Sequence, residues 1–532
     1  MLRPIRKNEY IMLKNSIIFK RSRIALYTLI AFFISLETIH LTLPAIHFDE
    51  AALGNVAYSI SQGQFPLMLG SYHGAIEEYF LSPFITVFGC NAISLRIFAI
   101  FVGVLVILAT YFVTKEFFEE KTAIIAVALL TCNFVFLEFM KMGLAHGSII
   151  LFFMLCPLYF FLKWFRGKSD LNFYFGVFLL GMGLSTRIWF AWFIIALLIS
   201  AVIFYHDLNK RIKGSKSKSR FFIISLFCFC AGSFPLVVYN LSSGFETIRC
   251  FHEVLKQFQY GVNSFTYNKN FSVRFNGFIS LLNGSGFFHY LDFSLSSLKN
   301  SLYLWVFALG LIWLCFAALF LKRKLVFSRK RVLFFLLIFS LIIPISSFTV
   351  PRFGVHYMFL LIPLVCIIIA ISVVSFFNIV RSKLVIFAVL AILSIAILKE
   401  ANLFIKLDDH LKRSGGEGAY SDAIYRLAVY LEQEELFNVI VSHWSFGLSI
   451  RFLSSNKIQY NYSESSDNYE ALVQGSPVYV AYATDEIRFR EGTFLNRVNF
   501  VKTVRKMNKK LIEKVKICKR DGKPVYIVYE IE

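Results

Sequence analysis

The chain has 532 residues, of which 57% are apolar and 17% are charged. Soluble domains contain about 45–50% apolar and about 25% charged residues. Phenylalanine alone accounts for 62 positions. This composition excludes a soluble enzyme, a disordered chain and a disulfide scaffold, and it indicates that much of the surface faces lipid. The nine cysteines form no CxxC pair and no Cys/His cluster, so no zinc site is predicted.

The net charge of +22 is unevenly distributed. Residues 1–398 carry 35 Lys and Arg against 15 Asp and Glu, whereas residues 399–532 carry 20 against 18. The basic excess therefore belongs to the hydrophobic part, where it is typical of cytoplasmic loops. We expect no nucleic-acid partner.

Apolar runs of about 18–22 residues predict membrane-spanning helices. Eleven such runs are found, at 24–45, 93–114, 122–139, 146–163, 171–187, 188–206, 221–240, 301–321, 332–350, 354–376 and 382–399. If the N-terminus is cytoplasmic, the inward segments hold 26 basic residues and the outward segments hold 8. This bias predicts that orientation and leaves the C-terminal part outside. Two outer loops, 46–92 and 241–300, are long enough to hold a site.

The predicted fold is a polytopic α-helical membrane protein, with a membrane domain at 1–399 and a separate outer α/β domain at 400–532. Within the latter, alternating apolar patterns predict strands and helices in alternation. The predicted strands are 437–444, 458–462, 478–483 and 525–531, and the predicted helices are 419–433 and 499–515.

The first outer loop has no Lys or Arg but has four carboxylates. Asp49 and Glu50 come first, and an apolar pattern at 53, 56, 57 and 60 then predicts an amphipathic helix on the membrane surface, ending near Gly63. Asp49 is either the N-cap of this helix or a functional carboxylate. A carboxylate at the lipid boundary without a neighbouring basic residue costs solvation free energy, and this cost favours a functional role for Asp49.

The other two carboxylates, Glu77 and Glu78, follow Tyr72 and His73. This segment is either a solvated polar loop or, together with the first acidic pair, part of an acid–base or cation site.

Further candidates lie near the outer ends of the predicted spans. Glu138 and Lys141 either pair with each other at a spacing of i, i+3 or, with His146, contribute to a site. Glu37 and His40 are either a helix–helix pair or functional groups.

Few cations face outward. Arg187, Arg352 and the His356–Tyr357 pair lie at span ends on the same side as the carboxylates. They either extend towards the membrane surface as isolated side chains or together bind a phosphate.

These features resemble the GT-C glycosyltransferases, the class of the protein O-mannosyltransferases and the bacterial lipid A aminoarabinose transferases. The resemblance rests on Asp49–Glu50 after the first span, the surface helix, and the loop from Tyr72 to Gly74. It also includes the run from Phe88–Gly89 to Ser94–Leu95–Arg96, which leads into the second span, and the outer α/β domain.

The resemblance implies transfer of a sugar from a polyprenyl-phosphate donor to a hydroxyl of a glycan, lipid or protein acceptor, with inversion at the anomeric carbon. Asp49 is then the catalytic carboxylate that takes the acceptor's proton, and Glu50 orients the site or holds the surface helix. It also implies a bacterial inner membrane, with the endoplasmic reticulum as the alternative. The substrate-binding candidates are Tyr72, His73, Glu77, Glu78, Lys141, His146, Arg187, Arg352, His356 and Tyr357.

The sequence departs from the family at His146, where many relatives carry Asp. No metal ligands are predicted, and a divalent cation as cofactor is left open.

Two alternatives remain open. A flippase or transporter of lipid-linked sugars typically shows internal repeats, and none is visible here. A polymerase or ligase of O-antigen type would use the loop 241–300, with Arg249, His252 and Arg274.

Overall fold

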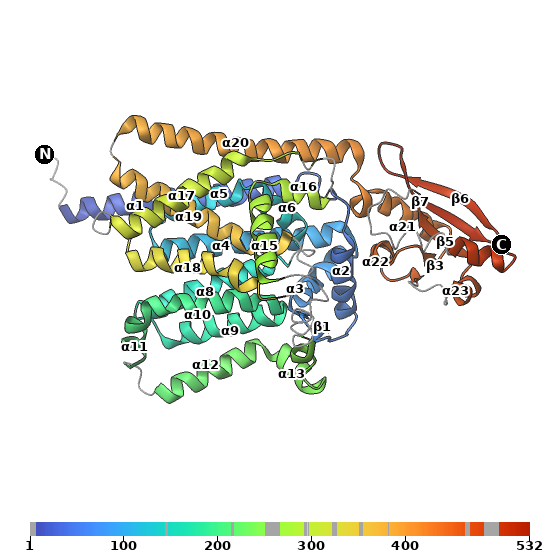
Figure 1. Ribbon diagram of the computed structural model, residues 1–532, viewed down its shortest axis with the longest axis horizontal. Helices are drawn as coiled ribbons and strands as arrows, with labels where there is room; N and C mark the ends of the chain where they lie inside the picture. Colours follow the sequence, from blue (N-terminus) through green and yellow to red (C-terminus); the bar gives the residue numbers. More distant parts are fainter. Residues whose placement is uncertain are drawn as a thin grey trace.

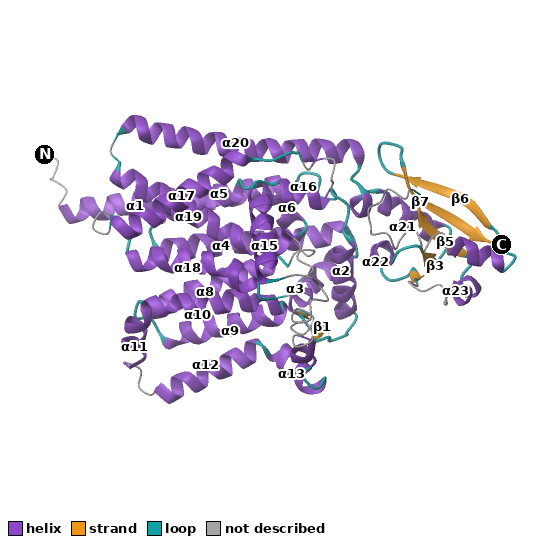
Figure 2. Cartoon of the chain, viewed as in Figure 1, coloured by secondary structure: helices purple, strands orange, loops and turns teal. Residues whose placement is uncertain are grey.

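The computed structural model describes residues 7–143, 147–213, 218–250, 266–291, 295, 297–321, 327–349, 355–380, 382–462, 469–483 and 500–532. Two parts follow one another along the long axis of the molecule (Figure 1). A bundle of long helices comes first. A smaller region, which contains the main β-sheet, lies beyond one end of the bundle (Figure 2).

The bundle and its connections contain α1 (Lys7–Thr38), α2 (Phe48–Ser61), α3 (Ile76–Phe88), α4 (Ala92–Phe117), α5 (Glu120–Thr131), α6 (Phe134–Lys141), α8 (Ile149–Phe165), α9 (Asp170–Thr186), η1 (Ile188–Phe190), α10 (Ala191–Ala201), η2 (Val202–Phe204), α11 (Tyr205–Lys213), α12 (Lys218–Gly232), α13 (Phe234–Ser242), α15 (Tyr267–Leu282), α16 (Ser285–Leu291), α17 (Ser301–Phe320), α18 (Arg329–Ser346), η4 (Val355–Leu361), α19 (Ile362–Ile379) and α20 (Lys383–Ser414). Each of the predicted apolar runs overlaps one helix or consecutive helices. The run 24–45 extends beyond the end of α1 at Thr38, and the run 188–206 is covered by η1, α10, η2 and the start of α11.

Two of the predicted runs are broken. The run 122–139 becomes α5 and α6, with a bend of 63° between them. The run 221–240 becomes α12 and α13, with a bend of 74°. Asn133 lies at the first break and caps α6, because its side chain accepts a hydrogen bond from the amide of Phe136. Apolar character alone cannot reveal such a bend.

By length and apolar composition, five helices in the described residues can cross a membrane, or seven if each bent pair is one span. Helices α8 and α9 have 17 residues each, slightly fewer than the roughly 20 of a typical span. The protein is a multi-pass integral membrane protein. The number of eleven spans stays a prediction.

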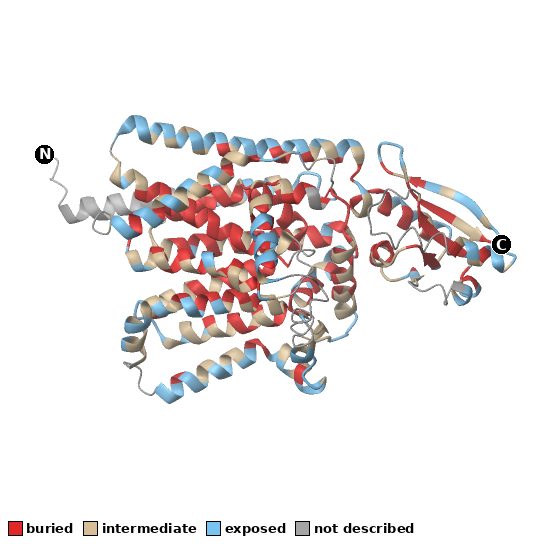
Figure 3. Cartoon of the chain, viewed as in Figure 1, coloured by how far each residue is buried: buried red, intermediate tan, exposed pale blue. Residues whose placement is uncertain are grey.

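Burial divides the bundle into a core and a lipid-facing rim (Figure 3). Helix α19 lies inside, against α4, α5, α17 and α18. Helix α20 lies along the edge and exposes Leu384, Phe387 and Leu398, at 77%, 70% and 67% of their surface. A helix that exposes large apolar side chains along its length suits a lipid environment.

The C-terminal region is an α/β layer, as predicted. It contains η5 (Gly418–Tyr420), α21 (Ala423–Gln433), β3 (Asn438–Val441), α22 (Trp444–Leu453), β4 (Gln459–Asn461), α23 (Tyr469–Gly475), β5 (Val478–Tyr482), β6 (Leu511–Cys518) and β7 (Pro524–Ile531). The strand order is β4-β3-β5-β7-β6. Strands β4, β3 and β5 run parallel, and β7 and β6 are antiparallel to their neighbours.

One secondary-structure prediction in this region was wrong. The predicted helix 499–515 is helical only at 500–506 within the described residues, and β6 starts at Leu511. Val515 and Ile517 alternate with Lys514 and Lys516, which is the period of a strand at a sheet edge. The predicted domain boundary at residue 400 falls inside α20, which continues unbroken to Ser414.

Candidate active site

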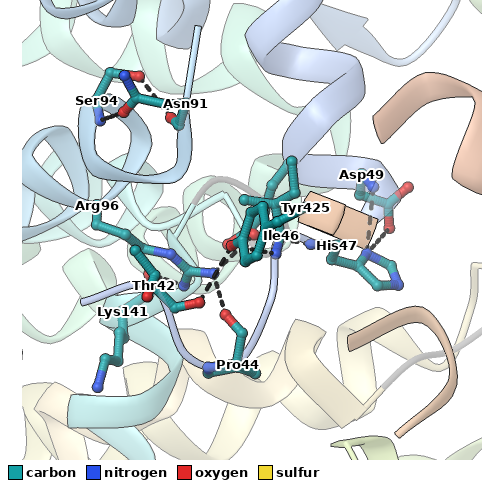
Figure 4. Close-up of polar contacts among 11 residues, drawn as sticks. Thr42, Pro44, Ile46, His47, Asp49, Asn91, Ser94, Arg96, Lys141 and Tyr425 are labelled. Atoms are coloured by element: carbon teal, nitrogen blue, oxygen red, sulfur yellow. Dashed lines mark hydrogen bonds and ion pairs between the residues drawn. The ribbon is translucent and has the colours of Figure 1, made fainter. Parts of the chain in front are cut away.

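The first acidic pair, Asp49 and Glu50, lies in the first turn of α2, and the segment between α1 and α2 ends in a capping box at His47. The side chain of His47 accepts a hydrogen bond from the amide of Asp49 at 3.3 Å, and Glu50 accepts one from the amide of His47 at 3.0 Å. This reciprocal pair starts α2 at Phe48. Asp49 is therefore not the N-cap, and the interpretation of it as a capping residue was wrong. Its side chain is 48% exposed. Figure 4 shows Asp49 beside the ring of His47.

The predicted amphipathic helix is present, but protein covers it. Helix α2 packs on α3 and on α22 of the C-terminal region. Gly54 faces the ring of Phe452, and a Cβ at Gly54 would lie 2.6 Å from that ring. Asn55 donates a hydrogen bond to the carbonyl of Leu448 at 3.0 Å. Helix α2 is thus held between α3 and α22, and this packing fixes the orientation of the helix that carries Asp49.

Glu50 has a structural role. Its side chain is 1% exposed and pairs with Arg96 of α4 at 2.9 Å. Arg96 also donates to the carbonyls of Lys141 and of Pro44, the latter at 3.3 Å. Arg96 thereby ties the α1–α2 segment to the bundle. A buried ion pair of this kind needs both partners, because either charge alone would be buried without compensation.

A short hairpin places the next group of candidates. Strands β1 (Met68–Gly70) and β2 (His73–Gly74) pair, and His73 forms a bridge with Arg187. The amide of Ile188 donates to the carbonyl of Tyr72 at 3.1 Å. A Cβ at Gly74 would lie 2.1 Å from the carbonyl oxygen of Ser185. This close approach requires glycine, and it brings the loop to the end of α9 where Arg187 lies.

Glu77 and Glu78 do not lie in a solvated loop, as one interpretation of the sequence held. They form the first turn of α3, and both are fully buried. Glu77 lies 3.5 Å from the guanidinium of Arg187, and Glu78 lies 3.3 Å from Nε2 of His73. Burial, only partly offset by Arg187, raises the pKa of Glu77 to about 8 and that of Glu78 to about 7.

His73 stays neutral in this setting. Burial and the charge of Arg187 lower its pKa to about 2, and Asp49 opposes this shift. His356 of η4 also interacts electrostatically with both Asp49 and Arg187. The predicted residues Asp49, His73, Arg187 and His356 thus form one electrostatic cluster, although they come from α2, β2, the end of α9 and η4.

Aromatic side chains flank this cluster beside Arg187. The ring of Tyr357 lies 5.5 Å from that of Trp189 and 6.3 Å from that of Trp192. Tyr72 is 63% exposed at the tip of the hairpin. The cluster therefore combines an exposed acid, a cation and an aromatic wall.

Lys141 belongs to a second group, on the side of Arg96. Its ammonium donates to the carbonyl of Ile39 at 2.8 Å, and the side chain is 5% exposed. Glu138 and Glu37 are buried nearby, at 3% and 1% exposure. The Lys141 contact attaches the start of the α1–α2 segment to α6 of the bundle. His40 instead pairs with Asp408 of α20 at 2.6 Å.

Several candidates cannot be placed together with these. His146, Arg352 and His252 lie outside the described residues. Arg274 is 2% exposed and donates to the carbonyl of Thr349 at 2.7 Å, and Arg249 donates to the carbonyl of Ser243 at 2.7 Å.

The structure also reveals residues that the sequence analysis did not single out as site residues. Arg96 is the fifth residue of α4, and a charge near the start of a span is a signal for function. Tyr425 of α21 contacts the α1–α2 segment from the C-terminal region. No local pattern connects it to Asp49, since they are far apart in sequence.

Metal binding finds no support among the described residues. No group of three or more His, Cys, Asp or Glu side chains there is arranged to hold a metal ion.

This arrangement has known counterparts. Residues 73–233 match the family model of dolichyl-phosphate-mannose-protein mannosyltransferases. No curated protein matches the chain significantly. The chain shares the fold of the GT-C membrane glycosyltransferases, the fold that the sequence predicted. The family matched by residues 73–233 belongs to the same class.

Two solved structures illustrate the likeness in fold. ArnT from Cupriavidus metallidurans, solved with undecaprenyl phosphate, has a TM-score of 0.58 at 11% identity, and the match covers 94% of this chain and 97% of ArnT. The oligosaccharyltransferase AglB from Archaeoglobus fulgidus, solved with an inhibitory peptide and a dolichol-phosphate, has a TM-score of 0.53 at 15% identity. That match covers 87% of this chain and 70% of AglB.

Proposed function

We propose that this protein is an inverting glycosyltransferase that moves a sugar from a polyprenyl-phosphate donor to the hydroxyl of a glycan, lipid or protein acceptor. The observation that carries the proposal is that one cluster contains both an exposed carboxylate, Asp49, and a cation, Arg187. The charges of both residues affect the pKa of His73. The transfer needs a base for the acceptor and a positive charge for the leaving phosphate.

In this scheme Asp49 takes the proton of the acceptor hydroxyl while that oxygen attacks the anomeric carbon. The bond between this carbon and the phosphate oxygen breaks, and polyprenyl phosphate leaves with the bonding electrons. Attack from the face opposite the phosphate inverts the configuration. Arg187 compensates the negative charge that grows on the phosphate.

The buried glutamates preserve the charge of Arg187. Because the pKa of Glu77 is raised to about 8, this carboxyl is largely protonated at neutral pH and does not cancel the charge of the adjacent guanidinium. His73, kept neutral, serves as a hydrogen-bonding group rather than as a second cation. Tyr357, Trp189 and Trp192 provide an apolar wall beside the phosphate site for the first part of the lipid.

The location proposed for this reaction is the outer face of a bacterial inner membrane, with the N-terminus in the cytoplasm. The distribution of Lys and Arg supports this orientation. The C-terminal α/β region, proposed as a separate outer domain at 400–532, then covers the site from the aqueous side. Helix α20 joins it to the bundle.

The function is tested with purified protein in lipid vesicles that contain undecaprenyl-phosphate mannose or undecaprenyl-phosphate 4-amino-4-deoxyarabinose. A cell-envelope extract supplies acceptors. The expected result is acceptor-dependent release of free undecaprenyl phosphate. Movement of an intact lipid-linked sugar across the bilayer without release would instead favour a flippase.

A further inference from the structure

The segment Thr42–His47, which joins α1 to α2, is held between the bundle and the C-terminal region. On the bundle side, Arg96 contacts the carbonyl of Pro44 and the carboxylate of Glu50. On the other side, the amide of Ala45 donates to the carbonyl of Tyr420 at 3.0 Å. The rings of His47 and Tyr420 are stacked, with centroids 4.8 Å apart. The residue that precedes α2 is therefore packed against the C-terminal region.

Tyr425 makes the most specific contact with this segment (Figure 4). Its hydroxyl donates to the carbonyl of Thr42 at 3.1 Å and accepts from the amide of Ile46 at 3.2 Å. A single hydroxyl thus uses its donor and its acceptor function on two peptide groups of one turn. The turn leads directly into the capping box formed by His47 and Glu50. His47 lies two residues before Asp49.

We infer that Tyr425 is a positioning residue for the reaction: the C-terminal region sets the place of the Asp49 carboxylate through the Tyr425 hydroxyl. The inference rests on the proposed function. It gives the C-terminal α/β region a part in catalysis besides covering the site. A second contact links α2 to the same region, because the ring of Phe48 packs edge-on against Trp444 of α22, with centroids 5.1 Å apart.

The physical reason lies in the sensitivity of proton transfer to distance. A base must lie within hydrogen-bond reach of the hydroxyl that it deprotonates. A displacement of about 1 Å by a change outside the reacting groups can lower the rate by about a hundredfold. The donor is held elsewhere, by Arg187 and the aromatic wall. Loss of the Tyr425 hydroxyl is thus expected to affect turnover and leave donor binding intact.

The test compares Tyr425→Phe with Tyr430→Phe, which removes a hydroxyl from the same helix on the side that packs on the sheet region. Both variants keep the aromatic ring. The turnover number and the KM for the lipid donor are measured with whichever undecaprenyl-phosphate sugar the wild type uses. Thermal midpoints of both variants are recorded in the same vesicles.

For Tyr425→Phe we expect a kcat reduced about tenfold or more and a donor KM within about twofold of the wild type. The variant should still unfold cooperatively, with a midpoint lowered only by the loss of two hydrogen bonds. Tyr430→Phe should match the wild type in both constants. A Tyr425→Phe variant with wild-type kcat, or one whose loss of rate comes with an equal rise in KM or with loss of the cooperative unfolding transition, would overturn the inference. Absence of any release by the wild type would instead overturn the proposed function.

Discussion

Asp49 and Glu50 are neighbours in the sequence but lie in opposite environments. The side chain of Asp49 is 48% exposed, whereas that of Glu50 is 1% exposed and paired with Arg96 at 2.9 Å. The capping box explains the division, because it turns Glu50 back towards the amide of His47 and leaves Asp49 directed outward. One acidic pair therefore supplies both the proposed base, Asp49, and its anchor, Glu50.

The anchoring role of Glu50 predicts a loss of stability on substitution. Glu50→Ala leaves Arg96 buried without a counter-charge, and we expect a loss of about 3–5 kcal/mol in the free energy of unfolding. Glu50→Gln keeps the shape and a hydrogen-bonding oxygen and should be less damaging. The measurement is the thermal midpoint of each variant in detergent. A Glu50→Gln protein with a wild-type midpoint but no activity would show that Glu50 acts in the chemistry instead.

The close approach at Gly74 predicts a specific loss of donor binding. Gly74→Ala places a methyl group 2.1 Å from the backbone oxygen of Ser185, so the hairpin must move away from Arg187. We expect the KM for the lipid donor to rise about tenfold or more, since a hydrogen bond to a charged group contributes about 1.5–3 kcal/mol. Gly70→Ala is the matched control on the same hairpin, because nothing lies within 4 Å of its added methyl group. Equal KM values in the two variants would contradict this role of the hairpin.

The buried glutamates predict a pH dependence of stability. Their pKa values in the folded protein, about 8 for Glu77 and about 7 for Glu78, lie above the unfolded value of 4.5. The folded state then binds more protons than the unfolded state, and stability is lost as the pH rises towards 8. His73, whose pKa is lowered to about 2, acts in the opposite sense, but only below its unfolded value of 6.5.

Between pH 6.5 and 8.5 the glutamates therefore act without His73, and the thermal midpoint of the wild type should fall across this window. Glu77→Gln cannot ionise and should show a flatter profile, with a higher midpoint than the wild type at pH 8.5. A wild-type midpoint that rises with pH, or a variant with the wild-type slope, would contradict the assignment.

The sequence predicted the membrane bundle, its apolar runs and the C-terminal α/β layer well, because long apolar stretches and short alternating strands have strong signals. It missed α3, which begins at Ile76 and contains Pro83 and two glutamates. It also extended a helix into β6. Contacts between distant parts of the chain explain why α3 was missed. Glu77 and Glu78 can be buried in its first turn because Arg187 and His73, from other parts of the chain, lie beside them.

The candidate site was predicted in part. The sequence identified Asp49, His73, Arg187 and His356 by type and by expected side of the membrane, and the structure brings them into one cluster. Their roles remain predictions. It could not identify Tyr425, because the contact with Ile46 joins residues 379 positions apart and depends on how the C-terminal region packs on α2.

The most direct test of the central claim is acceptor-dependent release of undecaprenyl phosphate by wild type, Asp49→Asn and Asp409→Asn in the same vesicles. Asp409 is 53% exposed on α20 and pairs with Arg413, so its substitution is a matched loss of one exposed carboxylate. The account predicts release by the wild type and Asp409→Asn, and a rate lowered about 10²–10⁴-fold in a folded Asp49→Asn protein. Release by Asp49→Asn at the wild-type rate would contradict it.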